Sequence, residues 1–244
     1  MKFKKFFSIV LLVFIIFLTA CTSYNEENSS SNKDNKPTEE TKILELNGVE
    51  KAKINLDFPA GILNINGNEE KLMKWKYIYS KKEWKPEVKY EVKDKQGNIS
   101  ISQHLSKSDK DNTRNEWNIN LNDKIPMYIK LGLGAGDFKA NLSNVNLKEL
   151  YVHMGVGRVN LDISGAYKNN IKVNIQGGVG EATVYLPKSI GSRIKVQKGV
   201  GAVNVNGFIQ EEGDIYKNSQ YGKTKNNIEV NIETGVGSIK VKQK

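Results

Sequence analysis

A Gly-x-Gly motif recurs five times between residues 134 and 237, and it constrains the fold more than any other feature of the chain. Alternating apolar residues stand before and after every copy, and this period of two is typical of β-strands. The second glycines are separated by 21, 23, 21 and 36 residues. We expect each copy to be a strand–turn–strand unit, with units stacked so that each shares a thin core with the next. The glycines are Gly134, Gly136, Gly155, Gly157, Gly178, Gly180, Gly199, Gly201, Gly235 and Gly237.

Glycine-rich segments can either cradle phosphate or shape a turn. Gly132, Gly134 and Gly136 have the spacing of a nucleotide loop, but such a loop is followed by a helix whose N-terminus receives the anion. A second strand follows here instead. We therefore expect structural corners, in which the glycines supply positive φ or close backbone approach and the central Ala or Val fills the interior.

A sixth, degenerate copy lies at Pro59-Ala60-Gly61, between the alternating apolar residues of 54–58 and 63–65. Proline replaces the first glycine, and atypical units of this kind often stand at the ends of repeat folds.

Aromatic and other apolar residues alternate with lysines between residues 68 and 122, a segment that holds Trp75, Trp84 and Trp117. This pattern predicts an antiparallel meander with an aromatic inner face and a lysine-rich outer face. Interleaved aromatics and lysines also occur where proteins bind sugars or anionic polymers. A core face beside a solvated face is the commoner origin of such rows, and we favour it here.

One charged residue directly follows each of the first three Gly-x-Gly copies: Asp137, Arg158 and Glu181. If the units stack in register, these residues form an exposed charge ladder. Two carboxylates beside an arginine are also elements of a glycan-cleaving site. We favour the ladder, because no histidine or further acid occupies an equivalent position to support catalysis.

Residues 208–226 lengthen the last spacing, and their composition predicts an ordered, turn-rich excursion. Asp214 and Asn218 could ligate a cation, but hard cations take about six or more oxygen ligands. We expect a structural role for this segment and no metal site.

The N-terminus has the features of a lipoprotein leader. Three lysines in residues 1–5 precede an apolar run over 6–18, which is too short to span a bilayer as a helix. Leu18-Thr19-Ala20-Cys21 resembles the bacterial lipobox, whose cysteine receives a diacylglyceryl group. We predict a signal helix over 1–20, lipidation of Cys21 and a disordered tether over 21–42. The alternative is an uncleaved anchor with an incidental cysteine.

Composition excludes several mechanisms. A single cysteine cannot form an internal disulfide, a thiolate zinc site or a redox pair, and two histidines cannot build a multi-histidine metal site. We expect no cofactor and no catalytic residue. The net charge of +10 falls to +7 without the leader lysines. Such a field favours anionic lipids or wall polymers, whereas nucleic acid is a poor partner outside the cytoplasm.

The Gly-x-Gly units, together with Ile125-Pro126 and Leu186-Pro187, resemble the toast-rack family of β-repeat domains, which are also called "putative adhesins". The resemblance covers residues 45–244. It implies an all-β, right-handed, solenoid-like domain related to the β-domain of accessory membrane proteins in the cell-wall-antibiotic response of Gram-positive bacteria. The family has no established catalytic residues. We expect one domain over 43–244, with the atypical unit and meander over 43–125 and the regular units over 126–244.

Three functions remain open from the sequence. The first is a non-enzymatic lipoprotein on the outer face of the cell membrane, which presents a scaffold to an envelope protein or an anionic wall polymer. A polysaccharide-acting enzyme is the second, since β-helical folds host lyases and hydrolases. The third is an accessory regulator of envelope stress that contacts a membrane sensor. The sequence leaves the partner and the oligomeric state open.

Overall fold

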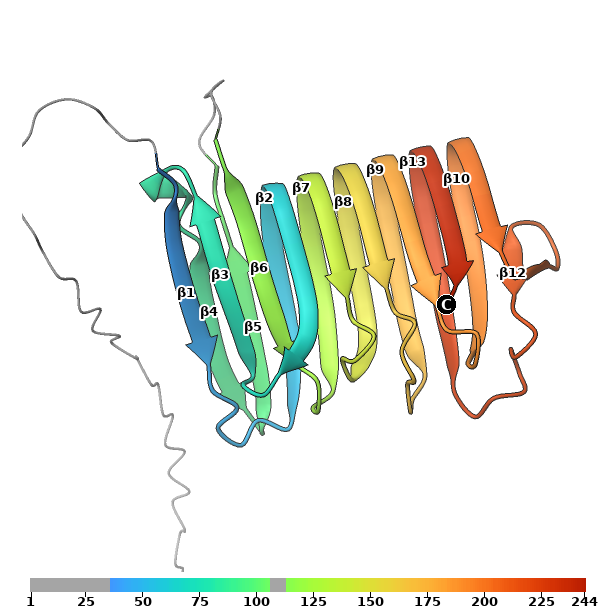
Figure 1. Cartoon of the computed structure of the whole chain (residues 1–244), viewed down its shortest axis with the longest axis horizontal. Coiled ribbons are helices and arrows are strands. Elements are labelled where there is room, and N and C mark those ends of the chain that lie inside the picture. Colours follow the sequence, from blue (N-terminus) through green and yellow to red (C-terminus); the bar gives the residue numbers. More distant parts are fainter. Residues whose placement is uncertain (1–35, 106–112) are drawn as a thin grey trace, which may run out of the picture. The chain divides into compact units, whose positions relative to one another are not determined.

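Six long strands, each bent near its middle, form the body of the fold (Figure 1). The computed structural model describes residues 36–105 and 113–244, which fall within one compact unit, Asn35–Lys244. A short 3-10 helix, Lys82–Trp84, accompanies the strands. The strands are β1 (Thr38–Leu44), β2 (Lys51–Glu69), β3 (Met73–Tyr79), β4 (Glu87–Lys93), β5 (Gln96–Ser102), β6 (Asn115–Asn122), β7 (Met127–Asn141), β8 (Leu147–Asp162), β9 (Ile171–Leu186), β10 (Gly191–Asn206), β11 (Ile209–Gln210), β12 (Ile215–Lys217) and β13 (Asn227–Gln243).

Each bent strand is one rung, with an N arm before its glycine corner and a C arm after it. The rungs pair in parallel, so the N arms form one layer and the C arms form a second layer that faces it. In both arms every second side chain is buried, as the alternating apolar pattern predicts. The two rows of buried side chains meet in one core between the layers. This confirms an all-β repeat architecture.

The order of the rungs differs from the order of the sequence. The rungs follow β2-β7-β8-β9-β13-β10, so the last rung of the chain is inserted between β9 and β10. Residues 208–226 make this crossover possible: they form β11 and β12, and β12 pairs antiparallel with the N arm of β10. The excursion therefore extends the N-arm layer beyond β10 instead of merely interrupting the array.

The prediction of an antiparallel meander between residues 68 and 122 is wrong. β5 and β6 pair in parallel with the N arm and the C arm of β2, while β4 and β3 pair antiparallel with β5 and β6 in the two different layers. The Pro59-Ala60-Gly61 rung is consequently internal, not terminal. The physical reason is that β2 has two arms, and both need a neighbour on the side away from β7.

The aromatic row of β3 is core, as expected. Trp75, Tyr77 and Trp117 are each at most 2% exposed. The Trp117 ring lies 5.2 Å from that of Tyr77 and 4.9 Å from that of Phe58, which belongs to the opposite layer. These aromatic rings therefore join the two layers at this end of the array.

The boundary of the folded unit lies earlier than predicted. β1 begins at Thr38, inside the predicted tether, because Thr38–Leu44 pairs antiparallel with β3. The predicted signal helix and the lipidation residue Cys21 lie outside the described residues. Within 36–105 and 113–244, no helix has the length and apolar character needed to cross a membrane.

Candidate binding groove and corners

The glycine corners stack directly on one another. The second glycine of each pair has a φ between +131° and +150°, a backbone region that side chains disfavour. A Cβ on Gly157 would lie 1.9 Å from the carbonyl oxygen of Gly136, and one on Gly180 would lie 1.8 Å from that of Gly157. Glycine is therefore required at the second position for two reasons: its φ is positive, and the backbone of the neighbouring rung approaches too closely for a side chain.

The central residue of each corner does not fill the interior, which corrects the sequence expectation. Val156, Val179, Val200 and Val236 are 48–70% exposed and stand in register at the apex. The reason is geometric, since a strand bent through three residues places the middle side chain on the convex side.

The charge column forms in register on the outer face of the C-arm layer. Arg158 donates two hydrogen bonds to Asp137, from Nε to Oδ1 at 2.7 Å and from Nη2 to Oδ2 at 2.6 Å. This contact lowers the pKa of Asp137 below its usual value. Glu181 forms an ion pair with Lys240, which lowers the pKa of Glu181 as well. Both carboxyls are therefore ionised at neutral pH.

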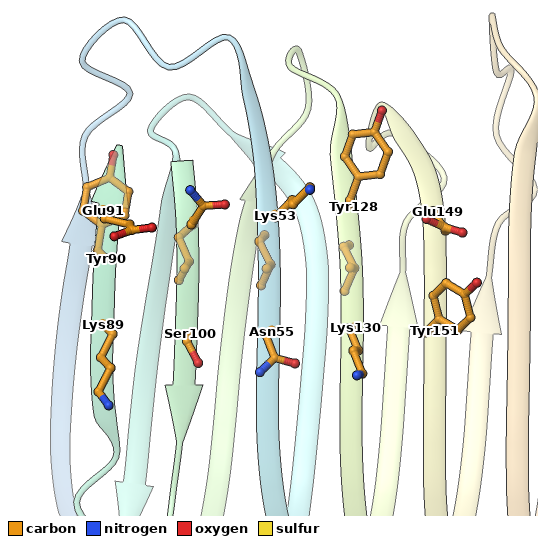
Figure 2. Close-up of a pocket in the computed structure, with 14 residues that line it drawn as sticks. Lys53, Asn55, Lys89, Tyr90, Glu91, Ser100, Tyr128, Lys130, Glu149 and Tyr151 are labelled. Carbon is orange, nitrogen blue, oxygen red and sulfur yellow. The ribbon is translucent and has the colours of Figure 1, made fainter. Parts of the chain in front are cut away.

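The outer face of the N-arm layer carries a groove of about 680 Å³ that runs across β4, β5, β2, β7 and β8 (Figure 2). The strand register aligns two rows of outward side chains across these five strands. The rows are Lys89, Ser100, Asn55, Lys130 and Tyr151, and Glu91, Asn98, Lys53, Tyr128 and Glu149. Neighbouring strands lie about 4.8 Å apart, so each row extends for about 19 Å. An elongated ligand would lie along the rows.

The groove combines three lysines and two outward tyrosine rings with two glutamates, Glu91 and Glu149. None of its three lysines, Lys53, Lys89 and Lys130, forms an ion pair with another described residue, whereas the nearby Lys95 pairs with Glu50. Tyr128 is half-buried and Tyr151 is 40% exposed, so each presents part of its ring. Unpaired lysines beside exposed rings can bind an anionic or sugar-containing chain.

Tyr90 lies at the β4 border of the groove and is partly buried. Burial raises the pKa of its hydroxyl, and this hydroxyl has no hydrogen-bond partner among the described residues. The Tyr90 ring packs against the core, so this hydroxyl belongs to the interior and not to the outward rows of the groove.

The remaining candidates do not form a site. Asn218 is buried and structural: its Oδ1 accepts a hydrogen bond from the Ser192 N–H at 2.9 Å, and its Nδ2 donates one to the Ile190 carbonyl at 2.8 Å. His104 and His153 are both exposed. The described part of the chain contains no cluster of three or more His, Cys, Asp or Glu side chains arranged to hold a metal ion.

Sequence reasoning missed the groove because it followed the inward residues of each strand. Tyr128 and Tyr151 occupy outward positions in β7 and β8, where polar residues are expected. Large aromatic residues at outward positions are the sequence signal that could have indicated this groove. Tyr128 lies beside Lys53 because β2 pairs with β7. Lys89 joins the same groove through the pairing of β5 with β2, which the expected meander did not contain.

The chain matches two family models. The model described as the N-terminal domain of toast_rack matches residues 31–185. A second model, the C-terminal domain of the cell wall-active antibiotics response protein LiaF, matches residues 133–241. No curated protein matches the chain at a significant level.

One solved structure resembles the chain closely in sequence and in fold. A structure described as a putative cell adhesion protein from Clostridium sporogenes is 70% identical, has a TM-score of 0.84, and covers 86% of this chain and 100% of its own. Structures described as putative adhesins from Bacteroides fragilis and Parabacteroides merdae are 12% and 11% identical, with TM-scores of 0.32 and 0.28. They cover 85% and 86% of this chain and 97% and 95% of their own, but scores this low carry no argument. The first match, the toast_rack model and the stacked glycine corners together assign the chain to the toast-rack family, to which it belongs.

Proposed function

We propose that this chain is a non-catalytic envelope lipoprotein, anchored through a diacylglyceryl group on Cys21, whose groove binds an anionic envelope polymer. The observation that carries the proposal is the groove across β4, β5, β2, β7 and β8, where Lys53 and Lys130 stand beside the rings of Tyr128 and Tyr151, and Lys89 lies at the far end of the same rows. Its three lysines form no ion pair with described residues and outnumber its two glutamates, Glu91 and Glu149. The match to a domain of cell wall-active antibiotics response proteins and the adhesion-related description of the 70% identical relative support an envelope setting.

The lipid anchor and the groove complement each other. Two acyl chains suffice for stable membrane attachment, and attachment holds the domain at a high local concentration of envelope polymer. A groove of modest affinity is then sufficient for stable association. The positive charge of the domain adds attraction that falls as salt rises.

Catalysis is the weaker candidate. A glycosidase needs one carboxylic acid whose pKa is raised, so that it can donate a proton to the leaving group. Asp137 and Glu181 both have lowered pKa values, and each is neutralised by a cationic partner. Their surface is better described as a charge ladder that stabilises neighbouring rungs.

A binding experiment on the soluble domain tests the groove. Residues 36–244 suffice, because the crystallised relative matches 86% of this chain over its whole length. The triple variant Lys53→Gln, Lys89→Gln, Lys130→Gln should bind isolated cell walls about a hundredfold more weakly at low salt, if each lysine contributes about 1 kcal/mol near an anionic surface. Sedimentation with walls at increasing protein concentration measures this change.

The matched control removes the same charge elsewhere. Lys198, Lys223 and Lys225 are exposed, lie outside the groove and form no ion pair with other described residues. Their triple replacement by glutamine should leave wall binding within about threefold. An equal loss in both triple variants would contradict a specific groove, and unchanged binding to walls stripped of phosphate polymer would rule out that polymer as ligand.

A further inference from the structure

One of the two rows in the groove continues across the rest of the N-arm layer. The strand register extends it beyond Tyr151 of β8 to Asn174 of β9, Asn231 of β13 and Lys195 of β10. We call the complete row the outer track, and its members in spatial order are Lys89, Ser100, Asn55, Lys130, Tyr151, Asn174, Asn231 and Lys195. Figure 2 shows the part from Lys89 to Tyr151. Neighbouring strands lie about 4.8 Å apart, so the outer track extends for about 34 Å.

The outer track contains no acidic residue, although the rows on both sides of it do. The acids are Glu91, Glu149 and Glu229 in one row, which also holds cations, and Glu87, Asp57 and Glu233 in the other, which holds no lysine or arginine. Outward residues of one strand lie about 7 Å apart, so both rows are close to a ligand on the track. The second row repels an anionic chain that leaves the track on that side, and the acids of the first row interrupt any cationic path there. The acid-free path therefore runs across the strands.

The cations of the outer track are widely spaced. Lys89, Lys130 and Lys195 are exposed and form no ion pair with another described residue. They are three and four strands apart, which corresponds to about 14 and 19 Å. The positions between them carry amides, a hydroxyl and the Tyr151 ring. Two of these amides are already ordered, because Asn231 donates a hydrogen bond from Nδ2 to Oδ1 of Asn174 at 3.0 Å. A second hollow of about 480 Å³ lies on this face at β9, β13 and β10, and Asn231 is part of its lining.

The C-arm layer has a comparable row whose charge is already partly neutralised. It contains lysines and amides in register from β3 to β10 and no acid. Two of its lysines, however, form ion pairs: Lys76 with Glu39, and Lys240 with Glu181. The outer track therefore differs from this row in having free lysines, and not in its amide content.

We propose that the outer track binds a linear glycan whose anionic groups are separated by uncharged sugars, and that this glycan lies across the strands from β4 to β10. The inference rests on the proposed function and extends it from the groove, which ends at β8, to a longer site with a defined ligand class. Widely spaced lysines match widely spaced anionic groups. The amides and the hydroxyl between them can hydrogen-bond sugar hydroxyls, and the Tyr151 ring, in a side chain that is 40% exposed, can pack against a sugar face.

Two other polyanions match the outer track less well. A polymer with a charge on every unit would place most of its charges opposite neutral side chains. An acidic peptide would find one aromatic ring and no aliphatic side chain along the track, whereas the core of a protein–protein interface is largely apolar.

Binding of defined oligosaccharides to residues 36–244 tests the proposal. The probes are hyaluronan oligosaccharides, which carry one carboxylate on every second sugar. The dodecasaccharide is longer than the outer track and the tetrasaccharide is shorter. We expect the dodecasaccharide to bind at least about tenfold more tightly at low salt, because only the longer chain reaches all three lysines. Linear polyphosphate and polyglutamate with the same total charge should bind more weakly than the dodecasaccharide. Isothermal titration calorimetry measures all four affinities.

Two matched pairs of variants locate the site. Lys195→Gln should weaken dodecasaccharide binding about fivefold. Lys198→Gln removes the same charge from the same strand, at an exposed residue beside the corner, and should leave binding unchanged. Asn231→Asp places an acid in the outer track and should weaken binding, whereas Asn204→Asp places an acid on the outer face of the C-arm layer and should not. Unfolding midpoints of the four variants establish that each remains folded.

Several outcomes would overturn the proposal. These are no binding of hyaluronan, equal binding of the two oligosaccharides, or equal effects of Lys195→Gln and Lys198→Gln. Tighter binding of polyphosphate would assign the site to a densely charged phosphate polymer, and tighter binding of polyglutamate would assign it to an acidic peptide.

The outer track and the groove can fail separately, because Lys195 lies outside the groove. If the groove triple variant loses wall binding and Lys195→Gln does not, the proposed function stands and the extended track is wrong. If the groove triple variant keeps wall binding, the proposed function itself is wrong.

Discussion

At each corner, the carbonyl oxygen of a glycine in one rung occupies the place where a Cβ would stand in the next rung. The contacts run from Gly61 through Gly136, Gly157 and Gly180 to Gly237, at 1.7–2.0 Å for an added Cβ. The requirement for glycine is therefore mutual, because a side chain in any rung would displace the backbone of its neighbour. The exposed central valines show that the constraint applies to the flanking glycines alone.

Replacing Gly157 by alanine should destabilise the domain severely. The new Cβ would lie 1.9 Å from the Gly136 oxygen at a φ of +144°; the backbone strain alone costs about 1–3 kcal/mol, and the clash adds to it. Urea unfolding measures the loss. Gly177→Ala is the control, because its Cβ would meet only a Thr234 methyl group at 3.6 Å. Equal stability of the two variants would contradict the close stacking of corners.

The Asp137–Arg158 contact should make a pH-dependent contribution to stability. Because the folded-state pKa of Asp137 is lowered, the contribution is complete above its unfolded pKa of about 3.9 and disappears as the pH falls through the folded value. Asp137→Asn should therefore unfold more easily than wild type at pH 7, with a difference that shrinks below pH 4. Urea titrations at pH 7 and below pH 4 measure this difference.

Glu212→Gln is the control, because Glu212 is exposed and forms no ion pair with described residues. It should show no pH-dependent difference from wild type. A constant effect of Asp137→Asn at all pH values would contradict the assignment.

At the scale of the element, one bent strand serves both layers at once. β13 pairs with β9 and β10 along both arms, and its inward residues Ile228, Val230, Ile232, Ile239 and Val241 are all at most 1% exposed. β10 has Lys198 in the inward column and two half-buried valines, a composition suited to the end of the array. Apolar content on both arms thus favours the inner position for β13.

Ending the chain after Asn226 should disrupt more than one rung. Because β13 lies between β9 and β10, its removal takes away the long partner of β10, and amides of β10 and β12 should lose protection from hydrogen exchange. Amides of β7 should remain protected, because both of its neighbours are still present. Hydrogen exchange followed by mass spectrometry measures both regions. Retained protection in β10 would show that β10 can pair with β9 directly, as sequence order would have it.

At the scale of the whole folded unit, the two outer faces have different chemistry. The face of the N-arm layer carries the groove with its lysines and tyrosines, and the face of the C-arm layer carries paired charges. The rungs alternate inward and outward residues identically, so the difference between the faces lies entirely in the outward positions. Binding capacity can therefore change without any change in the core.

Removing the proposed anchor should change how the protein is extracted from cells. Wild-type protein should require detergent, whereas Cys21→Ser should be released by high salt, because the groove alone holds it through screened charge. Immunoblots of salt and detergent fractions distinguish the two. Ser23→Ala leaves the proposed lipidation residue intact and should behave as wild type. Release of wild-type protein by salt would contradict lipid anchoring.

The local geometry follows from short stretches of sequence: alternating apolar residues specify strands with one buried face, and glycine pairs specify where those strands bend. These are constraints within a few residues, so they can be read from the chain. Tertiary structure decided the insertion of β13, the division of residues 73–122 between two layers, and the groove. Those features depend on which of the possible strand pairings buries the most apolar surface, and this is decided between strands far apart in the sequence. Outward side chains such as Lys89 and Tyr151 come to line the same groove only after the strand pairing has fixed the register.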